Sequence, residues 1–417
     1  MAKKTIRDVD LSGKRVFVRV DYNVPLKEEN GRMVITDDTR IRATLPTLQA
    51  LLEQNARLIL ASHLGRPKGK VDPSKSLRPA AARLSELLDK PVAFAEDCVG
   101  EPAAKAAESL NPGDIVLLEN VRFHPEEEKN DPAFAAELGK RAEAYVNDAF
   151  GSAHRAHAST EGVARVVKAK GGPCVAGLLI EKELKFLGEE LENPKRPFVV
   201  ILGGAKVSDK IKVIDRLLEK ADALLIGGAM AYTFKLAQNQ PAGASLVEPE
   251  RAQDALNALE KAKTLGVRLL LPVDQVAAEK ADTGQTDKKG KPIYEYRNPR
   301  VCKDDLRDNE AGLDIGPETV KLYTEVILGA KTILWNGPMG LFEDDRFAAG
   351  TEAIGRAVAE ATQKNQAVSI IGGGDSVTAI NKAGLGDKVT WMSTGGGASL
   401  EFLEGKVLPG VAALDDK

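Results

Sequence analysis

FVVILGGAKVSDK, residues 198–210, joins an apolar strand candidate to the start of a helix. The five apolar residues 198–202 predict a buried strand, two glycines end it, and apolar residues with helical spacing follow from Ile211. A strand, a glycine turn and a helix start aim backbone N–H groups at an anion. Lys206 and Lys210 are four residues apart, so we expect both on the same side of that helix start. The alternative is a tight turn with two solvated lysines.

The second half of the chain repeats this arrangement. Strands are expected at 198–202, 223–226, 268–271, 332–335, 367–371 and 389–392, and four of these six end in paired or triple glycines. Glycine lets the backbone approach a ligand and exposes N–H groups at helix starts, although it also permits close strand–helix packing. Because four such turns lie at one end of one sheet, we expect them to face a ligand. Asp375, directly after one of them, is placed to accept from those N–H groups or to hold a cation.

The first half also alternates strands and helices, which predicts a parallel sheet covered on both faces. Its strand candidates are 15–20, 58–61, 92–94, 114–118 and 144–147. Ligands of such sheets bind beyond the carboxyl ends of the strands. The polar residues expected there are Asn23, His63, Arg66, Arg122 and Arg155, with Arg40 opening the first helix. Arginine forks match phosphate and carboxylate groups, so this half is predicted to bind a small polyanion.

Three other polar segments of the chain are not expected to form binding sites. The acidic run 126–128 is expected to be a solvated helix start, and the charged stretch 280–292 an exposed hairpin or loop. His154 and His157 are three residues apart, but no third ligand at a suitable spacing supports a metal site.

Length and composition describe a two-domain globular protein. The chain has 417 residues, more than one compact core accommodates, and an amphipathic helix at 181–195 is the expected connector. A net charge of −3 and 5% aromatic residues disfavour binding to nucleic acid or an anionic membrane surface. Three widely separated cysteines are expected to be free, buried thiols in a reducing cytosol. No signal-peptide core or membrane-length apolar run is evident, so a soluble, cytoplasmic protein is expected.

Several chemistries lack their sequence signatures. No P-loop pattern occurs, and no G-x-G-x-x-G opens a helix after the first strand of either half. A Ser-centred nucleophile elbow is missing, and no cysteine stands beside a candidate histidine. One half of the chain supplies arginines, and the other supplies glycine turns, lysines and a carboxylate. These are the groups that phosphoryl transfer requires.

Nine motifs along the chain resemble, in order, those of the phosphoglycerate kinase family. They are RVDYNVP (19–25), SHLGRP (62–67), ENVRF (119–123), NDAFGSAHRAHA (147–158), LGGAKVSDK (202–210), LDIGP (313–317), WNGP (335–338), GGGD (372–375) and STGGG (393–397). The resemblance implies reversible transfer of the acyl phosphate of 1,3-bisphosphoglycerate to Mg-ADP, giving 3-phosphoglycerate and ATP in glycolysis. It also implies a monomer of two Rossmann-like lobes that close for the reaction. The substrate lobe would be 1–180 with 405–417 packed back on it, the hinge 181–197, and the nucleotide lobe 198–404.

The resemblance also assigns site residues. The implied phosphoglycerate pocket is Asp21, Asn23, Arg40, His63, Leu64, Gly65, Arg66, Arg122 and Arg155. The implied nucleotide contacts are Lys206, Lys210, Gly312, Asn336, Pro338, Glu343, Gly373, Gly374, Asp375 and Ser376, with Asp375 as the Mg²⁺ ligand. Arg40, Lys206 and the backbone at Gly373 and Gly396 are implied to stabilise the transferred phosphoryl group.

One departure concerns the adenine side of the nucleotide site. The family usually has an aromatic residue and a methionine before Gly312, where this chain has Glu310 and Ala311. Two other functions stay open at this point, a nicotinamide-dependent dehydrogenase and a non-catalytic binding protein on the same scaffold. Substrate-dependent ATP formation, a change in cofactor absorbance, or nucleotide binding without turnover distinguishes the three.

Overall fold

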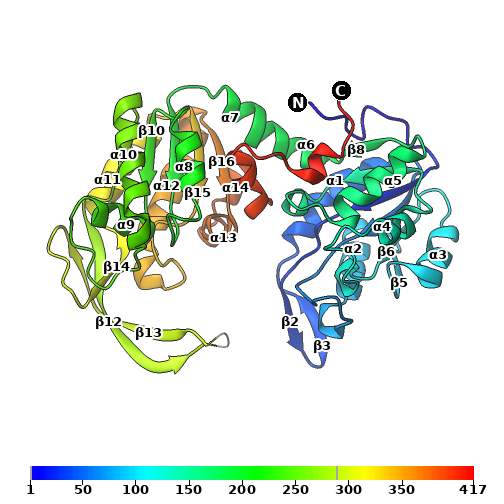
Figure 1. The fold of residues 1–417 in the computed structure, drawn as a ribbon, viewed down its shortest axis with the longest axis horizontal. Helices are drawn as coiled ribbons and strands as arrows, with labels where there is room; N and C mark the ends of the chain where they lie inside the picture. The colour runs from blue at the N-terminus through cyan, green and yellow to red at the C-terminus, as the bar shows by residue number, and fades with distance from the viewer. Residues whose placement is uncertain (1, 288–289) are drawn as a thin grey trace. The chain divides into compact units, whose positions relative to one another are not determined.

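The computed structural model describes residues 2–287 and 290–417, which form two compact units. Unit 1 comprises Met1–Lys185 and Lys406–Lys417, and unit 2 comprises Phe186–Gly405. Each unit contains a six-stranded parallel sheet accompanied by helices (Figure 1). The predicted α/β architecture is confirmed.

The sheet of unit 1 has the strand order β5-β6-β4-β1-β7-β8. The strands are β1 (Arg15–Arg19), β4 (Arg57–Ala61), β5 (Ala93–Ala95), β6 (Ile115–Leu118), β7 (Ala144–Asn147) and β8 (Cys174–Ala176). The helices are α1 (Thr39–Glu53), α2 (Arg78–Leu88), α3 (Gly100–Glu108), α4 (Pro132–Gly139), α5 (Val163–Ala169), α6 (Leu178–Glu183) and α15 (Pro409–Ala412). Because all pairings in this sheet are parallel, the loops that follow the strands share one edge.

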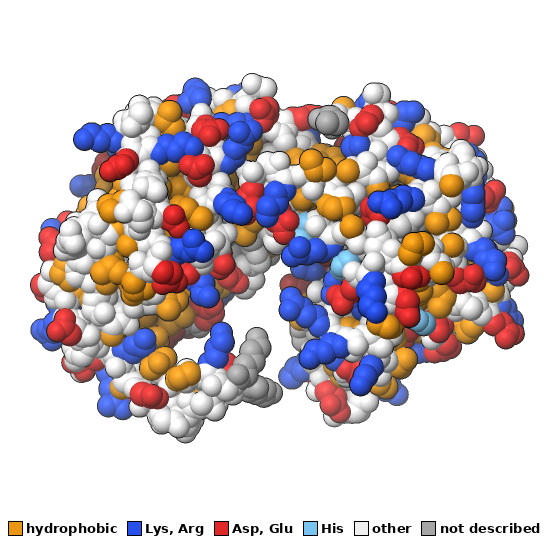
Figure 2. Space-filling model, in the orientation of Figure 1, with side chains coloured by type: hydrophobic (Ala, Val, Ile, Leu, Met, Phe, Trp, Pro, Cys, Tyr) orange, Lys and Arg blue, Asp and Glu red, His pale blue; other side chains and the backbone are white. Residues whose placement is uncertain are grey.

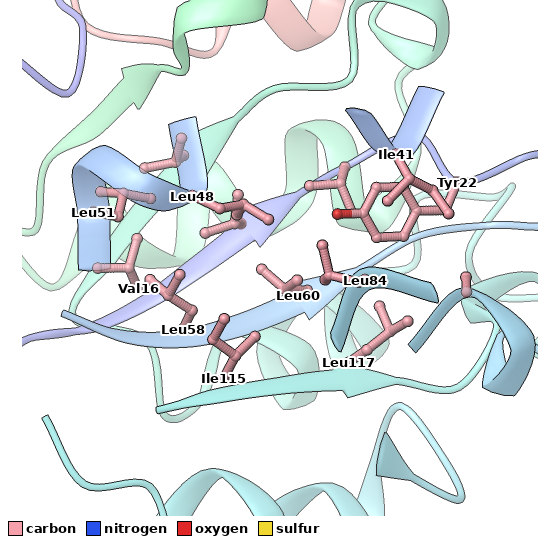
Figure 3. Packing of buried hydrophobic residues seen from close by; sticks show 14 of the residues in the cluster. Val16, Tyr22, Ile41, Leu48, Leu51, Leu58, Leu60, Leu84, Ile115 and Leu117 are labelled. Atoms are coloured by element: carbon pink, nitrogen blue, oxygen red, sulfur yellow. The ribbon is translucent and has the colours of Figure 1, made fainter. Parts of the chain in front are cut away.

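The core of unit 1 follows from the alternation of side chains along its strands. Val16 on β1 and Leu58 and Leu60 on β4 pack with Leu48 of α1 and Leu84 of α2 (Figure 3). The intervening residues point to the opposite face of the sheet, where the rings of Phe17 and Tyr145 stack with centroids 6.1 Å apart. The near-continuous apolar strands are therefore explained by burial on both faces.

A short hairpin, β2 (Leu26–Glu29) and β3 (Arg32–Ile35), lies in a segment for which the sequence analysis predicted no element. Asn30 and Gly31 form its turn with φ angles of +50° and +75°. Asn-Gly is the strongest short signal for such a turn, so the hairpin could have been predicted from the sequence.

The sheet of unit 2 has the order β11-β10-β9-β15-β16-β17. Its strands are β9 (Phe198–Leu202), β10 (Ala223–Ile226), β11 (Arg268–Leu270), β15 (Thr332–Asn336), β16 (Val368–Gly372) and β17 (Trp391–Met392). Its helices are α7 (Glu190–Glu192), α8 (Ile211–Leu217), α9 (Met230–Ala237), α10 (Ala252–Leu265), α11 (Pro317–Leu328), α12 (Ala349–Asn365), α13 (Gly374–Lys382) and α14 (Gly397–Leu403). All six predicted strands are present, and their ends differ from the predicted ones by at most two residues.

Two further features of the chain lie outside this sheet. β12 (Gln275–Thr286), β13 (Pro292–Cys302) and β14 (Glu310–Ile315) form a separate antiparallel sheet, and the exposed hairpin expected at 280–292 is its β12–β13 part.

The connector expected at 181–195 begins with α6, continues as a π-helix over Leu184–Glu189 and ends with α7. No helix in the described part of the chain has both the length and the apolarity required to cross a bilayer.

In the first two glycine turns of unit 2, the glycine N–H groups donate to main-chain carbonyls. We had expected these N–H groups to face a ligand. Gly203 N–H donates to the Asn336 carbonyl at 3.0 Å, and Gly204 N–H to the Pro338 carbonyl at 3.1 Å. Gly227 and Gly228 donate in the same way to Leu202 and Met339. A Cβ added at Gly203 would lie 1.9 Å from the Pro338 oxygen. The prediction that these N–H groups face a ligand was wrong, and the packing alternative explains these glycines.

The glycines that begin α13 and α14 have open surroundings instead. A Cβ added at Gly374 or Gly397 would meet no heavy atom within 4 Å. They are the last glycines of the third and fourth glycine turns, which follow β16 and β17. The N-terminal backbone of α13 and α14 therefore remains accessible, as expected for those two turns.

A matched pair of substitutions tests the difference between the packed glycine turn at Gly203 and the open one at Gly374. Gly203→Ala forces a methyl group against the 335–338 backbone and is expected to lower the free energy of unfolding by about 1–3 kcal/mol or more. Gly374→Ala places its methyl group in open space at a helix start, so its effect is expected to stay within about 1 kcal/mol. Urea denaturation followed by circular dichroism measures both, and equal destabilisation by the two changes would contradict the assignment.

Candidate active site

In unit 1, the polar residues predicted beyond β1 and β4 come together around a buried carboxylate. Asp21 accepts a hydrogen bond from Arg40 Nη1 at 3.0 Å and from the Asn23 N–H at 3.1 Å. Asn23 Oδ1 in turn accepts from the Gly65 N–H at 2.8 Å, which ties the two loops together. The carbonyl of Gly65 accepts from Arg122 Nη1 at 3.1 Å. Loops from three strands thus converge at one sheet edge, as the topology predicts.

Arg19, which the sequence analysis counted only as part of a strand, is a central member of this cluster. It is fully buried at the end of β1, and its Nη2 lies 3.1 Å from His63 Nδ1. Its Nε donates to Ser159 Oγ at 2.7 Å. A charged residue inside an apolar strand was the available signal, because a buried charge requires partners.

The acidic run 126–128 is not the solvated helix start that we expected. It forms a turn, and Glu127 is fully buried. Glu127 accepts from the Ser159 N–H at 2.9 Å and from Ser159 Oγ at 2.6 Å. Since Ser159 also accepts from Arg19, this hydroxyl links the two charges. Sequence spacing could not reveal a partner 32 residues away.

The ionisation of the cluster follows from burial and from the arginines. Burial opposes the charge on Asp21, but the neighbouring guanidinium groups of Arg40 and Arg19 help to hold its pKa below the usual value. Burial lowers the pKa of His63 well below its usual value, and Arg19 and Arg122 add to this effect. At neutral pH the cluster therefore contains a carboxylate, an uncharged imidazole and several arginines. This combination favours an anionic ligand.

The remaining residues of the predicted pocket lie on the loops that follow β4 and β7. Leu64 is buried, and its carbonyl accepts from Asn120 Nδ2 at 2.8 Å. Arg66 and Arg155 are exposed on the loops that follow β4 and β7. Burial, followed by the charges of Arg122, Arg19 and Arg155, lowers the pKa of His157 to about 4, so these charges act in one region. Figure 2 shows Lys and Arg side chains beside some of the histidine side chains of this unit.

In unit 2, the two lysines of the opening stretch have different surroundings. α8 begins only at Ile211, so both lysines precede the helix and the expected helical spacing does not apply. Lys206 is exposed. Lys210 is buried, and its Nζ donates to the Gly203 carbonyl at 2.6 Å, the Asn336 carbonyl at 2.7 Å and Asn336 Oδ1 at 2.8 Å. Burial lowers the pKa of Lys210 to about 7.

Asn336 directs an unused donor toward the start of α13. Its Nδ2 is buried without a hydrogen-bond partner among the described residues, 3.0 Å from where a Cβ at Gly372 would lie. Gly374 and Asp375 are exposed in the first turn of α13, behind Gly373 with φ of +86°. An accessible helix start, a free amide donor and a carboxylate fit a nucleotide phosphate with a divalent cation.

Three other residues predicted to contact the nucleotide differ from one another in burial and hydrogen bonding. Ser376 is buried, and its hydroxyl accepts from the Gly337 N–H at 2.6 Å. Pro338 is buried with its carbonyl bonded to Gly204, whereas Glu343 is exposed. Ser376 therefore also ties the start of α13 to the turn after β15, and Pro338 ties that turn to the turn after β9.

Gly312 lines a small pocket with Tyr232, Leu313, Asp314 and Met339. Its N–H donates to Ser245 Oγ at 2.9 Å, and a Cβ at Gly312 would overlap the Tyr232 hydroxyl. Only glycine fits at this position.

Glu310 and Ala311, where the chain departs from the family pattern, are both buried in β14. Both carboxylate oxygens of Glu310 accept from Arg300, at 2.8 and 2.7 Å, and hydrogen bonding to Arg300 lowers the pKa of Glu310 to about 2. This ion pair joins the buried Glu310 of β14 to the half-buried Arg300 of β13, on the other side of β12.

Comparison with known proteins agrees with the sequence motifs. The sequence model of the family described as phosphoglycerate kinase matches residues 6–406. The phosphoglycerate kinases of Chlorobium luteolum and Acidobacterium capsulatum are each 56% identical to this chain, over 415 and 425 residues, with complete coverage of both sequences.

Solved structures give the same result. Phosphoglycerate kinase from Coxiella burnetii is 40% identical with a TM-score of 0.83, and that from Pyrococcus horikoshii is 33% identical with a TM-score of 0.80. Both comparisons cover 99% of this chain and 98% of the other. The dehydrogenase alternative finds no support in any of these similarities. The chain belongs to the phosphoglycerate kinase family.

Proposed function

We propose that the chain transfers the acyl phosphate of 1,3-bisphosphoglycerate directly to ADP, forming 3-phosphoglycerate and ATP, and catalyses the reverse reaction. The observation that carries this proposal is the cluster of Arg19, Arg40 and Arg122 around ionised Asp21 and uncharged His63. Such a cluster suits a small ligand with both phosphate and carboxylate groups.

Unit 1 is the proposed site of the phosphoglycerate. Arg122 and the exposed Arg66 and Arg155 supply guanidinium groups for a phosphate, and His63 and Asn23 supply neutral hydrogen-bonding groups. Asp21 holds Arg40 by a 3.0 Å hydrogen bond, while leaving the remaining N–H groups of that guanidinium for substrate. Leu64 and Gly65 form the backbone wall of this pocket.

Unit 2 is the proposed site of the nucleotide. The accessible backbone at Gly373 and Gly374, with the free Nδ2 of Asn336, would bind phosphate oxygens. Pro338, Gly312 and Glu343 would contact the nucleoside side, and Ser376 and Lys210 would hold the loops that shape the phosphate site. Asp375 would hold Mg²⁺, which when bound neutralises charge on the nucleotide phosphates.

The proposed reaction is an in-line transfer that requires closure of the two lobes. The bond between phosphorus and the carboxyl oxygen breaks as a bond forms to the terminal phosphate oxygen of ADP, and 3-phosphoglycerate leaves as a carboxylate. Negative charge spreads over the three oxygens of the transferred group, where positive side chains and N–H donors stabilise it most. Arg40 and Lys206, with backbone N–H groups near Gly373 and Gly396, are the proposed donors. Closure also excludes water, which limits hydrolysis.

We further propose that the chain acts as a cytoplasmic monomer, a proposal that rests on the family resemblance. Sedimentation of the purified chain tests the monomer, because a dimer at working concentration would contradict it.

The activity assay is the direct test of the proposed function. With 3-phosphoglycerate and Mg-ATP we expect substrate-dependent ADP formation, and with a chelator that removes Mg²⁺ we expect it to fall by at least about tenfold. A coupled spectrophotometric assay measures both rates. Nucleotide binding without turnover would instead support a non-catalytic protein.

Lys206→Ala is expected to lower kcat by orders of magnitude and to change ADP binding little, because the lysine charge matters most in the transition state. Steady-state kinetics and calorimetric titration with ADP measure the two effects. Lys212→Ala, which removes another exposed lysine of the same segment, is the matched control and should retain normal turnover. Near-normal turnover of Lys206→Ala would exclude the proposed role.

Arg40→Ala is expected to reduce turnover by orders of magnitude while the fold survives, since the Arg40 side chain is 36% exposed. The control is Arg42→Ala, which removes an exposed arginine two residues away on α1. Circular dichroism and kcat are measured for both variants. If both variants lose activity equally, the loss reflects α1 and not a specific contact with the transferred group.

A further inference from the structure

Three side chains with different metal-binding atoms meet on unit 1 in the loops that follow β5 and β6. The carboxylate of Asp97, the thiol of Cys98 and the imidazole of His124 place their ligand atoms within 4.8 Å of one another. Asp97 and Cys98 precede α3 in the loop after β5, and His124 follows the short 3₁₀ turn Val121–Phe123 after β6. β5 and β6 are parallel neighbours with Ala95 beside Leu118, so the sheet itself brings the two loops together.

Contacts already restrain Asp97, Cys98 and His124. His124 Nε2 lies 2.7 Å from Asp97 Oδ1, and the same oxygen accepts from the Cys98 N–H at 2.6 Å. The ring of His124 lies against Phe134 with centroids 5.2 Å apart, which restricts its rotation. Cys98 is 2% exposed, whereas the side chains of His124 and Asp97 are 28% and 41% exposed. The thiol therefore lies beneath two ligands that solvent can reach.

We propose that Asp97, Cys98 and His124 form a binding site for a thiophilic divalent cation of the Zn²⁺ class. Sulfur, nitrogen and oxygen donors are the ligand set of tetrahedral zinc, and an open fourth position would take water. Tetrahedral bonds of about 2.0–2.3 Å place ligand atoms about 3.3–3.6 Å apart, so the present separations require adjustments of about 1 Å. Such adjustments are within the range of side-chain rotation at two partly exposed residues.

The thiol selects the class of metal. Mg²⁺ and Ca²⁺ prefer oxygen ligands, whereas thiolate and imidazole favour Zn²⁺ and Co²⁺. On binding, the metal takes the place of the thiol proton of Cys98, which leaves to water, and of the hydrogen bond between His124 and Asp97. The site therefore differs in chemistry from the Mg²⁺ position proposed at Asp375.

Metal binding here would also restrain the loop that carries a proposed substrate residue. Arg122 lies in the 3₁₀ turn that ends just before His124, and the His124 N–H donates to the Val121 carbonyl at 3.3 Å. A bound cation would tie this turn to the loop between β5 and α3.

Titration of the full chain with Co²⁺ alone, after chelator treatment under reducing conditions, tests the proposal. We expect one Co²⁺ per chain, the visible absorption of tetrahedral cobalt and a thiolate-to-cobalt charge-transfer band. One equivalent of Zn²⁺ should remove these signals, and a large excess of Mg²⁺ should leave them unchanged. Absence of the charge-transfer band, or displacement by Mg²⁺, would overturn the proposal.

Four variants locate the site. Cys98→Ser should abolish the charge-transfer band, and His124→Gln and Asp97→Asn should each weaken Co²⁺ binding by more than about tenfold. Cys174→Ser, which changes another buried free cysteine, is the control and should bind normally. His124→Gln and Asp97→Asn alter partly exposed side chains, so they decide the question if Cys98→Ser fails to fold. Unchanged Co²⁺ binding in these two variants would refute the assignment.

Discussion

The buried guanidinium of Arg19 is the constraint on which the first unit depends. A charge at the end of a central strand, out of contact with water, is tolerated only when partners surround it. Here Ser159 bridges Arg19 to buried Glu127, and His63 lies against its other side. These partners come from the loop after β4 and from the segments around residues 127 and 159. Satisfying one buried charge therefore fixes the loops that form the proposed substrate pocket.

In the second unit the buried ammonium group of Lys210 likewise requires partners that fix the surrounding turns. The three N–H groups of Lys210 match three oxygens of Gly203 and Asn336, which join the end of β9 to the end of β15. The close approach of these turns is possible only because Gly203 has no side chain. The stretch 198–210 is therefore chiefly a structural junction, from which exposed Lys206 extends. The accessible helix starts lie farther along the sheet, at α13 and α14.

Local patterns predicted the fold well, because continuous apolar segments between turn residues mark the strands of a parallel sheet. All six strands of the second sheet were located, whereas the β2–β3 hairpin was missed despite its Asn-Gly turn. Residues at strand ends, such as Asn23 and His63, were found for the same topological reason. Arg19, Glu127 and the Cys98–His124 proximity escaped because each depends on a contact between distant segments. Whether a glycine turn is open or filled likewise depends on its neighbours in space, as Gly203 and Gly374 demonstrate.

The proposed roles of the two units, phosphoglycerate binding by unit 1 and nucleotide binding by unit 2, follow from what each unit can offer to a phosphoryl group. Fixed guanidinium groups bind a ligand whose charge is permanent, and the arginine cluster of unit 1 suits an anionic acid that stays bound before and after transfer. Helix N-termini and an exposed lysine stabilise charge at positions where phosphates arrive and leave, because they need no counter-charge of their own. Arg40 differs from the buried Arg19 in retaining exposed N–H groups while Asp21 holds it in place. A donor that is both anchored and accessible is the kind of group that can follow charge as it moves from one substrate to the other.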